Sequence, residues 1–124
     1  MEKFIKEATY RTPAVICDAE TGVIDIRGKS TPENTYSFYQ PLTEWIIQYI
    51  NTPQPETYVN IELEYVNTSS SKWLYSIFKE LSKLISDTTK LSITWNYSDE
   101  DIEEVGKDLS SMLNLPMNFV EIPE

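Results

Sequence analysis

The fold is decided by one stretch, Glu64-Tyr65-Val66-Asn67-Thr68-Ser69-Ser70-Ser71-Lys72, in which a predicted strand ends and a predicted helix begins. The first turn of a helix leaves backbone N–H groups unpaired, and Asn, Ser or Thr can cap them through a side-chain oxygen. One or two hydroxyls suffice as caps, so the others can stay exposed. A phosphoryl group added there would be stabilised by the helix dipole and by free amides. The junction therefore favours a regulatory phosphorylation site over capping alone.

The residues on either side of this junction have the periodicity of a strand and of a helix. Across residues 57–66 apolar and polar residues alternate, which is typical of a strand with one buried face. After the hydroxyls, apolar residues recur at spacings of three and four, the pattern of an amphipathic helix: Leu74, Ile77, Phe78, Leu81, Leu84 and Ile85.

Toward the N-terminus, two short apolar runs at residues 14–18 and 23–27 are separated by four residues that end in Gly22. This arrangement predicts a β-hairpin. An apolar face over residues 39–50 then predicts a helix, in which Pro41 either starts the main helix or kinks it.

Toward the C-terminus, the pattern predicts a strand, a helix and a strand at residues 91–97, 98–112 and 117–122. The helix opens with a capping box, Ser98-Asp99-Glu100-Asp101. The full order is ββαβαβαβ, and its βαβ crossovers imply a mixed β-sheet with helices mainly on one face. We expect an α/β (α+β) fold in a single domain over residues 1–124.

Length and charge limit the kinds of partner. A chain of 124 residues suits one domain with a hydrophobic core. Ten Lys and Arg against twenty Asp and Glu give a net charge of −10, which repels nucleic-acid backbones and anionic membranes. The sequence shows neither an N-terminal apolar region nor a run of about 18 apolar residues. We expect a cytoplasmic protein with no nucleic-acid partner and no direct membrane insertion.

The residue inventory argues against catalysis. The chain has no His, which removes the commonest general base and the usual nitrogen ligand of zinc. Ser69 and Lys72 match the S-x-x-K nucleophile motif, but the companion S-D-N and K-T-G motifs are absent, so a Ser-Lys enzyme is the weaker alternative. Acidic residues 99–104 complement a helix dipole, and Cys17 lies in an apolar run. We expect no catalytic residue, no metal site and no cofactor.

Several separated motifs point to a known family. They occur in order along most of the chain: Thr12-Pro13-Ala14, Gly22-Val23-Ile24-Asp25-Ile26-Arg27-Gly28, Ser30-Thr31-Pro32-Glu33-Asn34, Phe38-Tyr39-Gln40-Pro41, Trp45 and the 64–72 stretch. The combination of Pro-Glu-Asn with Asn-Thr-Ser-Ser is specific. On these residues the chain resembles the SiaC-like regulatory phosphoproteins, formerly a domain of unknown function, whose fold is similar to that of STAS-domain anti-sigma-factor antagonists.

The resemblance implies a bacterial, non-enzymatic partner switch. A cognate Ser/Thr kinase would phosphorylate it and a PP2C-type phosphatase would reset it. By position in the motif Thr68 is the expected phosphoacceptor, with Ser69, Ser70 and Ser71 as alternatives. Members of the family look like partners of a diguanylate cyclase, and the unphosphorylated form would bind and activate this enzyme. The output would then be cyclic-di-GMP signalling and biofilm behaviour.

The surface that a partner would cover surrounds Thr68. Its expected members are Pro32, Glu33, Asn34, Tyr65, Asn67, Ser69, Ser70 and Lys72. Phosphorylation would place charge in this contact and expel a partner that offers no Arg or Lys. A constitutive protein-binding module without a phospho-switch is the alternative function.

Overall fold

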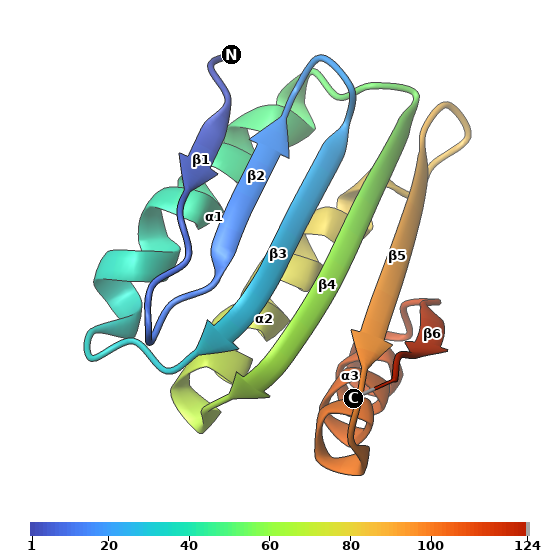
Figure 1. The fold of residues 1–124 in the computed structure, drawn as a ribbon. Helices are drawn as coiled ribbons and strands as arrows, with labels where there is room; N and C mark the ends of the chain where they lie inside the picture. The colour runs from blue at the N-terminus through green and yellow to red at the C-terminus, as the bar shows by residue number, and fades with distance from the viewer. Residues whose placement is uncertain (124) are drawn as a thin grey trace.

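The computed structural model describes residues 1–123 as six strands, three α-helices and one 3-10 turn (Figure 1). The strands are β1 (Phe4–Lys6), β2 (Ala14–Asp18), β3 (Val23–Ser30), β4 (Glu56–Val66), β5 (Lys90–Tyr97) and β6 (Asn118–Glu121). The helices are α1 (Thr35–Asn51), α2 (Thr68–Leu81) and α3 (Glu100–Leu113), and the 3-10 turn η1 (Ser82–Leu84) follows α2.

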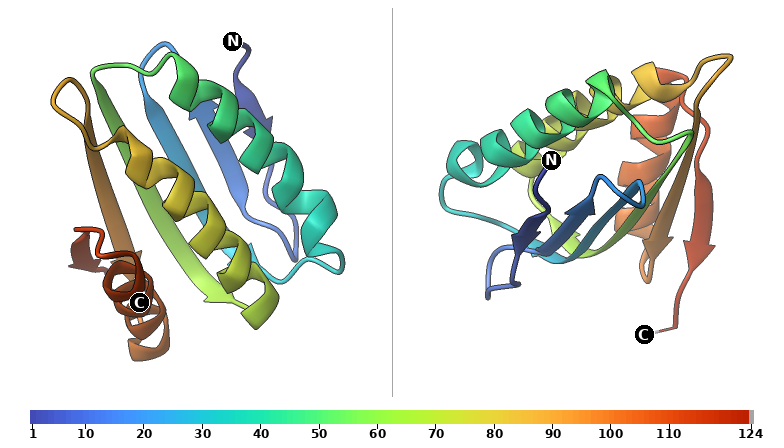
Figure 2. Two further views of the ribbon diagram at one scale, coloured as in Figure 1. Left: turned by 180° about the vertical axis from the view of Figure 1, so that it is seen from behind. Right: turned by 90° about the horizontal axis from the view of Figure 1, so that it is seen from above.

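All six strands form one mixed sheet whose spatial order is the order of the sequence, β1-β2-β3-β4-β5-β6. The pairs β1–β2 and β2–β3 are antiparallel, whereas β3–β4, β4–β5 and β5–β6 are parallel. Each parallel pair is connected through one helix. Seen from behind in Figure 2, all three helices lie on the same face of the sheet, which confirms the predicted α/β class and the one-sided arrangement.

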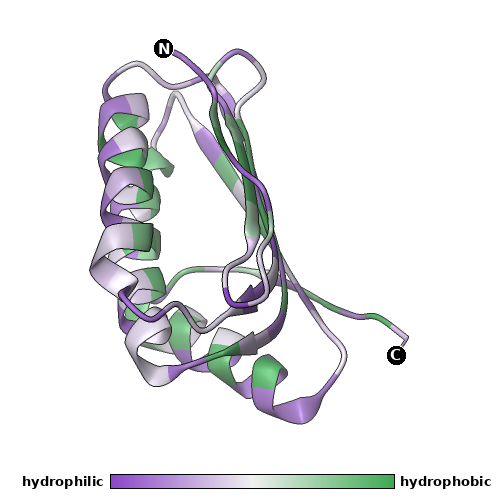
Figure 3. Cartoon of the chain, turned by 60° about the vertical axis from the view of Figure 1, so that its left-hand side comes forward, coloured by the Kyte–Doolittle hydropathy of each residue, from purple (hydrophilic) through white to green (hydrophobic). Residues whose placement is uncertain are grey.

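The core lies between this face of the sheet and the apolar sides of the helices. Figure 3 shows hydrophobic residues on the sides of the helices that face the sheet and hydrophilic residues on their outer sides. The largest fully buried side chains include Trp95, Tyr39, Tyr49 and Phe78. Burying one such side chain contributes about 1.5–3 kcal/mol. Cys17 is also buried, and burial together with nearby Asp25 raises the pKa of its thiol to about 12, so it is a packing residue.

The sequence-based prediction differs from the structure at a few points. It lacks β1, which pairs with β2 through only three residues. One of its two alternatives starts the main helix at Pro41, but α1 begins at Thr35 and continues through that residue. Pro41 and Ser37 both lie on the exposed side, so the Ser37 carbonyl that loses its N–H partner can bond water. The cap of α3 is Asp99, whose Oδ1 accepts from the Ile102 amide at 2.9 Å, one residue after the expected Ser98.

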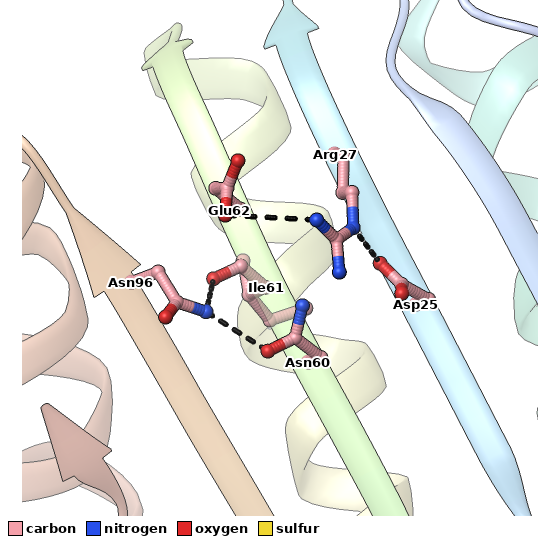
Figure 4. A network of polar contacts seen from close by, with 6 residues as sticks. All are labelled: Asp25, Arg27, Asn60, Ile61, Glu62 and Asn96. Atoms are coloured by element: carbon pink, nitrogen blue, oxygen red, sulfur yellow. Dashed lines mark hydrogen bonds and ion pairs between the residues drawn. The ribbon is translucent and has the colours of Figure 1, made fainter. Parts of the chain in front are cut away.

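The other face of the sheet carries no helix, and its central strands carry a set of polar contacts. In Figure 4, Arg27 on β3 bonds Asp25 at 2.8 Å and lies 3.7 Å from Glu62 on β4. These carboxylates raise the pKa of the Arg27 guanidinium, first through the hydrogen bond with Asp25. Asn96 on β5 donates to Asn60 Oδ1 at 2.9 Å. Polar groups on this face therefore pair both within β3 and across neighbouring strands.

Candidate functional site

The candidate site lies where β4 ends and α2 begins, at the lower end of the sheet in Figure 1. Asn67 makes the turn: its amide donates to the Ser30 carbonyl at 3.1 Å, and its Oδ1 accepts from the Ser70 amide at 2.8 Å. The helix cap is therefore an asparagine. Because Asn67 supplies the cap, none of the four following hydroxyls is needed for it.

The four hydroxyls after Asn67 have different surroundings. Ser70 is fully buried, accepts from Ser30 Oγ at 2.9 Å and donates to the Ser30 carbonyl at 3.2 Å. Ser69 is exposed, and its Oγ lies 2.8 Å from the hydroxyl of Thr35. Ser71 is half-buried on the side of α2 that faces α3. Thr68, the first residue of α2, is exposed, and within residues 1–123 its hydroxyl makes no side-chain hydrogen bond.

The buried hydroxyls connect three elements. Ser30 Oγ, at the end of β3, bonds both Ser70 on α2 and the phenol of Tyr39 on α1. Burial raises the pKa of Tyr39, so this phenol is neutral at physiological pH. Nearby, Trp73 stacks on Tyr39 with ring centroids 6.2 Å apart and meets the edge of Tyr36 at 5.9 Å. These contacts hold the start of α2 against α1.

The other residues expected at a partner surface are distributed unevenly. Glu33, Asn34, Tyr65 and Lys72 are exposed, and Tyr65 is 56% exposed. Asn34 caps α1 by accepting from the Ser37 amide at 3.1 Å, and Glu33 lies 3.9 Å from Arg11. Asn67 is half-buried in its capping role.

Two members of the expected surface are buried. Pro32 packs inside the loop before α1, and Ser70 belongs to the hydroxyl cluster with Ser30. In this conformation both side chains are shielded from solvent, so the structure does not present them as part of an open partner surface. Burial also makes Ser70 unavailable to a kinase, which leaves Thr68, Ser69 and Ser71 as candidate acceptors.

A groove of about 570 Å³ lies between α2 and α3, and Thr68 is one of its lining residues. The other lining residues are Ser71, Lys72, Tyr75, Ser76, Val105, Asp108, Leu109 and Met112. Sequence reasoning missed this groove because its lining residues on α2 end at Ser76 and those on α3 begin at Val105, 29 positions later in the chain. Met112, near the end of α3, lines the groove and is 63% exposed although it is apolar, which only the structure shows.

The geometry offers little to the Ser-Lys enzyme alternative. The bond of Ser69 Oγ goes to Thr35, and within residues 1–123 no hydrogen bond joins it to Lys72. A nucleophile needs a base within hydrogen-bond reach. Across the same residues, no cluster of three or more Asp, Glu, Cys or His is placed to hold a metal ion. None of the described helices has the length and apolar character required to cross a membrane.

Comparison with known proteins identifies the family. Residues 6–122 match the family model described as SiaC family regulatory phosphoprotein. The chain belongs to the SiaC family. An uncharacterized protein of Pseudomonas aeruginosa (strain UCBPP-PA14) is 26% identical over 110 residues, which is 87% of each chain. The predicted family resemblance is thereby confirmed.

Solved structures of SiaC share this fold. Apo-SiaC from Pseudomonas aeruginosa superposes with a TM-score of 0.87 at 24% identity, over 97% of this chain and 99% of that one. A second structure is that of the diguanylate cyclase SiaD in complex with its activator SiaC from the same species. Its matching chain gives a TM-score of 0.86 at 24% identity, over 96% of this chain and 99% of that one.

Proposed function

We propose that this SiaC family member is a non-enzymatic switch protein that is phosphorylated reversibly on Thr68. The observation that carries the proposal is the position of Thr68. It is exposed at the first position of α2, and Asn67 already provides the cap, so the Thr68 hydroxyl has no structural duty in residues 1–123. A phosphate there would meet the positive end of the helix dipole and the unpaired amides of the first turn.

In this proposal the unphosphorylated form binds and activates an effector such as a diguanylate cyclase, and the output is cyclic-di-GMP signalling in the cytoplasm. The support for this class of effector is the likeness to SiaC, whose structure is known in complex with the cyclase that it activates. A cognate Ser/Thr kinase adds the phosphate and a PP2C-type phosphatase removes it. The contact surface comprises Glu33, Asn34, Tyr65, Asn67, Ser69 and Lys72 around Thr68.

The switch would act through charge. A phosphorylated Thr carries a charge of about −1.5 to −2 near neutral pH. An effector that covers the bare hydroxyl would have to bury this charge unpaired, which is costly. The phosphorylated form would therefore release the effector, while the fold is kept because Thr68 packs in no part of the core.

The first test is to locate the phosphate. The purified chain is incubated with its cognate kinase and ATP, and the modified residue is mapped by mass spectrometry. We expect one phosphate on Thr68 and none on the Thr68→Ala variant, with Ser69→Ala and Ser71→Ala as matched controls that still accept it. A phosphate on Ser69 or Ser71 would contradict the choice of residue but not the switch.

The second test is to measure the output. Purified diguanylate cyclases of the source organism are assayed for cyclic-di-GMP synthesis with the unmodified chain, the phosphorylated chain and Thr68→Glu. We expect activation by the unmodified chain and its loss in the other two. Equal activation by all three would show a constitutive binding module instead, and activation of no cyclase would overturn this class of effector.

A further inference from the structure

The groove between α2 and α3 has the surface chemistry of a protein-docking site. Leu109, which is 3% exposed, and Val105 form apolar parts of its lining on α3, and Tyr75 contributes from α2. Met112 is 63% exposed beside them. A flexible apolar side chain at the rim of an apolar groove is typical of helix-binding surfaces.

The shape and lining of the groove favour a helix as the occupant. Its walls are two helices, and it contains no strand. An extended peptide would therefore lay its backbone N–H and C=O groups against apolar side chains without partners, which is costly. A helix satisfies its own backbone and presents an apolar stripe at i, i+3, i+4 and i+7 spacing.

Two opposite charges in the lining further define the occupant. Lys72 on α2 and Asp108 on α3 both line the groove, and both are exposed. Neither forms an ion pair with any residue in the 1–123 range, although six other ion pairs occur there. Lys72 is also one turn after Thr68, so the two side chains are neighbours on one face of α2.

Building on the proposed function, we propose that this groove receives an amphipathic helix of the effector that carries an acidic side chain for Lys72 and a basic side chain for Asp108. Phosphorylation of Thr68 acts on the first of these pairs. The phosphate lies within reach of the Lys72 ammonium and forms an ion pair with it. It also repels the acidic side chain of the effector. The direction of the switch follows from this exchange of partners at Lys72.

The charge part of the proposal is tested with Lys72→Glu. We expect binding of the unphosphorylated variant to the activated cyclase to weaken by about tenfold or more, since one partner of an interfacial ion pair is reversed. The matched control is Lys79→Glu, on the same helix but outside the groove, which should keep wild-type affinity. Exchanging the paired acidic residue of the cyclase for Lys should restore binding to Lys72→Glu.

The apolar part of the proposal is tested with Met112→Gln, which keeps length and helix propensity. We expect about a fivefold to tenfold loss of affinity from the lost apolar contact. Ile47→Gln is the control, because Ile47 is likewise an exposed apolar helix residue, 46% exposed, but lies on α1 away from the groove. Thermal unfolding of each variant shows whether it is folded.

The outcomes separate the two proposals. If the wild-type chain activates a cyclase and Thr68→Glu does not, but Lys72→Glu and Met112→Gln bind like wild type, the groove assignment is wrong and the switch stands. A cyclase helix seated elsewhere in a crystal structure of the complex would also overturn it. If the wild-type chain activates no cyclase of the source organism, both proposals fail together.

Discussion

Helices α2 and α3 both follow a strand of the parallel part of the sheet and both begin with a side-chain cap, but their first turns carry different residues. The first turn of α3 holds Glu100, Asp101 and Glu103. The first turn of α2 holds no acid and four consecutive hydroxyls from Thr68 on.

This difference shows how a reversible charge can be accommodated. In α3 the positive end of the helix dipole is complemented permanently by carboxylates. In α2 it is complemented by no charged side chain of the same helix, so a phosphate would supply what α3 already has. Under the proposed switch, the same physical interaction would be constant in α3 and under enzymatic control in α2.

The largest effect should come from the contact that anchors α2. Ser70→Ala removes buried hydrogen bonds with Ser30 and should lower the free energy of unfolding by about 1–3 kcal/mol. Ser69→Ala, which removes only an exposed bond, should change it by less than about 0.5 kcal/mol. Urea unfolding measures both. Equal losses would mean that burial does not distinguish these two hydroxyls.

A somewhat smaller effect is expected from the two caps. Asn67→Ala and Asp99→Ala should each cost about 1 kcal/mol, because each leaves an amide of the first turn unpaired. Asp99 also carries a charge, so the loss of stability in Asp99→Ala should be smaller in high salt. The loss in Asn67→Ala should not depend on salt. Unfolding at two salt concentrations tests this, and identical salt dependence would break the contrast between the two helices.

Phosphorylation itself should stabilise the protein. A phosphate on Thr68 should raise the free energy of unfolding by about 0.3–1 kcal/mol through the helix dipole. The gain should fall in high salt and should be absent when the same kinase treatment is applied to Thr68→Ala. A phosphorylated protein that unfolds more easily than the unmodified one would show that a negative charge at the N-terminus of α2 is destabilising.

The smallest effect concerns pH. The hydrogen bond with Lys107, at 2.9 Å, and then that with Tyr97 lower the pKa of Glu103 in the first turn of α3. Because the folded pKa lies below the unfolded one, this ion pair contributes above the usual pKa of glutamate, about 4.3, and its contribution is lost as the pH falls through the folded pKa.

This sign can be checked with Glu103→Gln. The variant should be less stable than wild type near neutral pH and should approach it in acid, as followed by thermal unfolding from pH 7 to pH 3. Unphosphorylated α2 has no acid in its first turn and gives no such dependence there. A constant difference between the two proteins across this range would contradict the assignment.

Much of the fold followed from local pattern. The alternation across β4 and the apolar spacing of α2 predicted both elements and the junction between them. The three-residue β1 was missed because so short a strand has no readable alternation and owes its existence to pairing with β2. The helix start expected at Pro41 was wrong, because a proline is tolerated inside a helix where the freed carbonyl, here that of Ser37, faces water.

The site was less predictable than the fold. In the sequence the hydroxyls of residues 68–71 are equivalent, and only the placement of Ser30, 40 positions before Ser70, shows which of them is buried. The burial of Pro32 depends in the same way on how its loop packs. The groove forms because α3 lies beside α2, and no local sequence pattern predicts which helices are neighbours.

The sequential strand order has a consequence for how the two sides of the groove can be altered. The strand β6 forms one edge of the sheet, and α3 directly precedes it in the chain. Substitutions on the outward side of α3 would therefore change one wall of the groove and leave the junction of β4 with α2 intact.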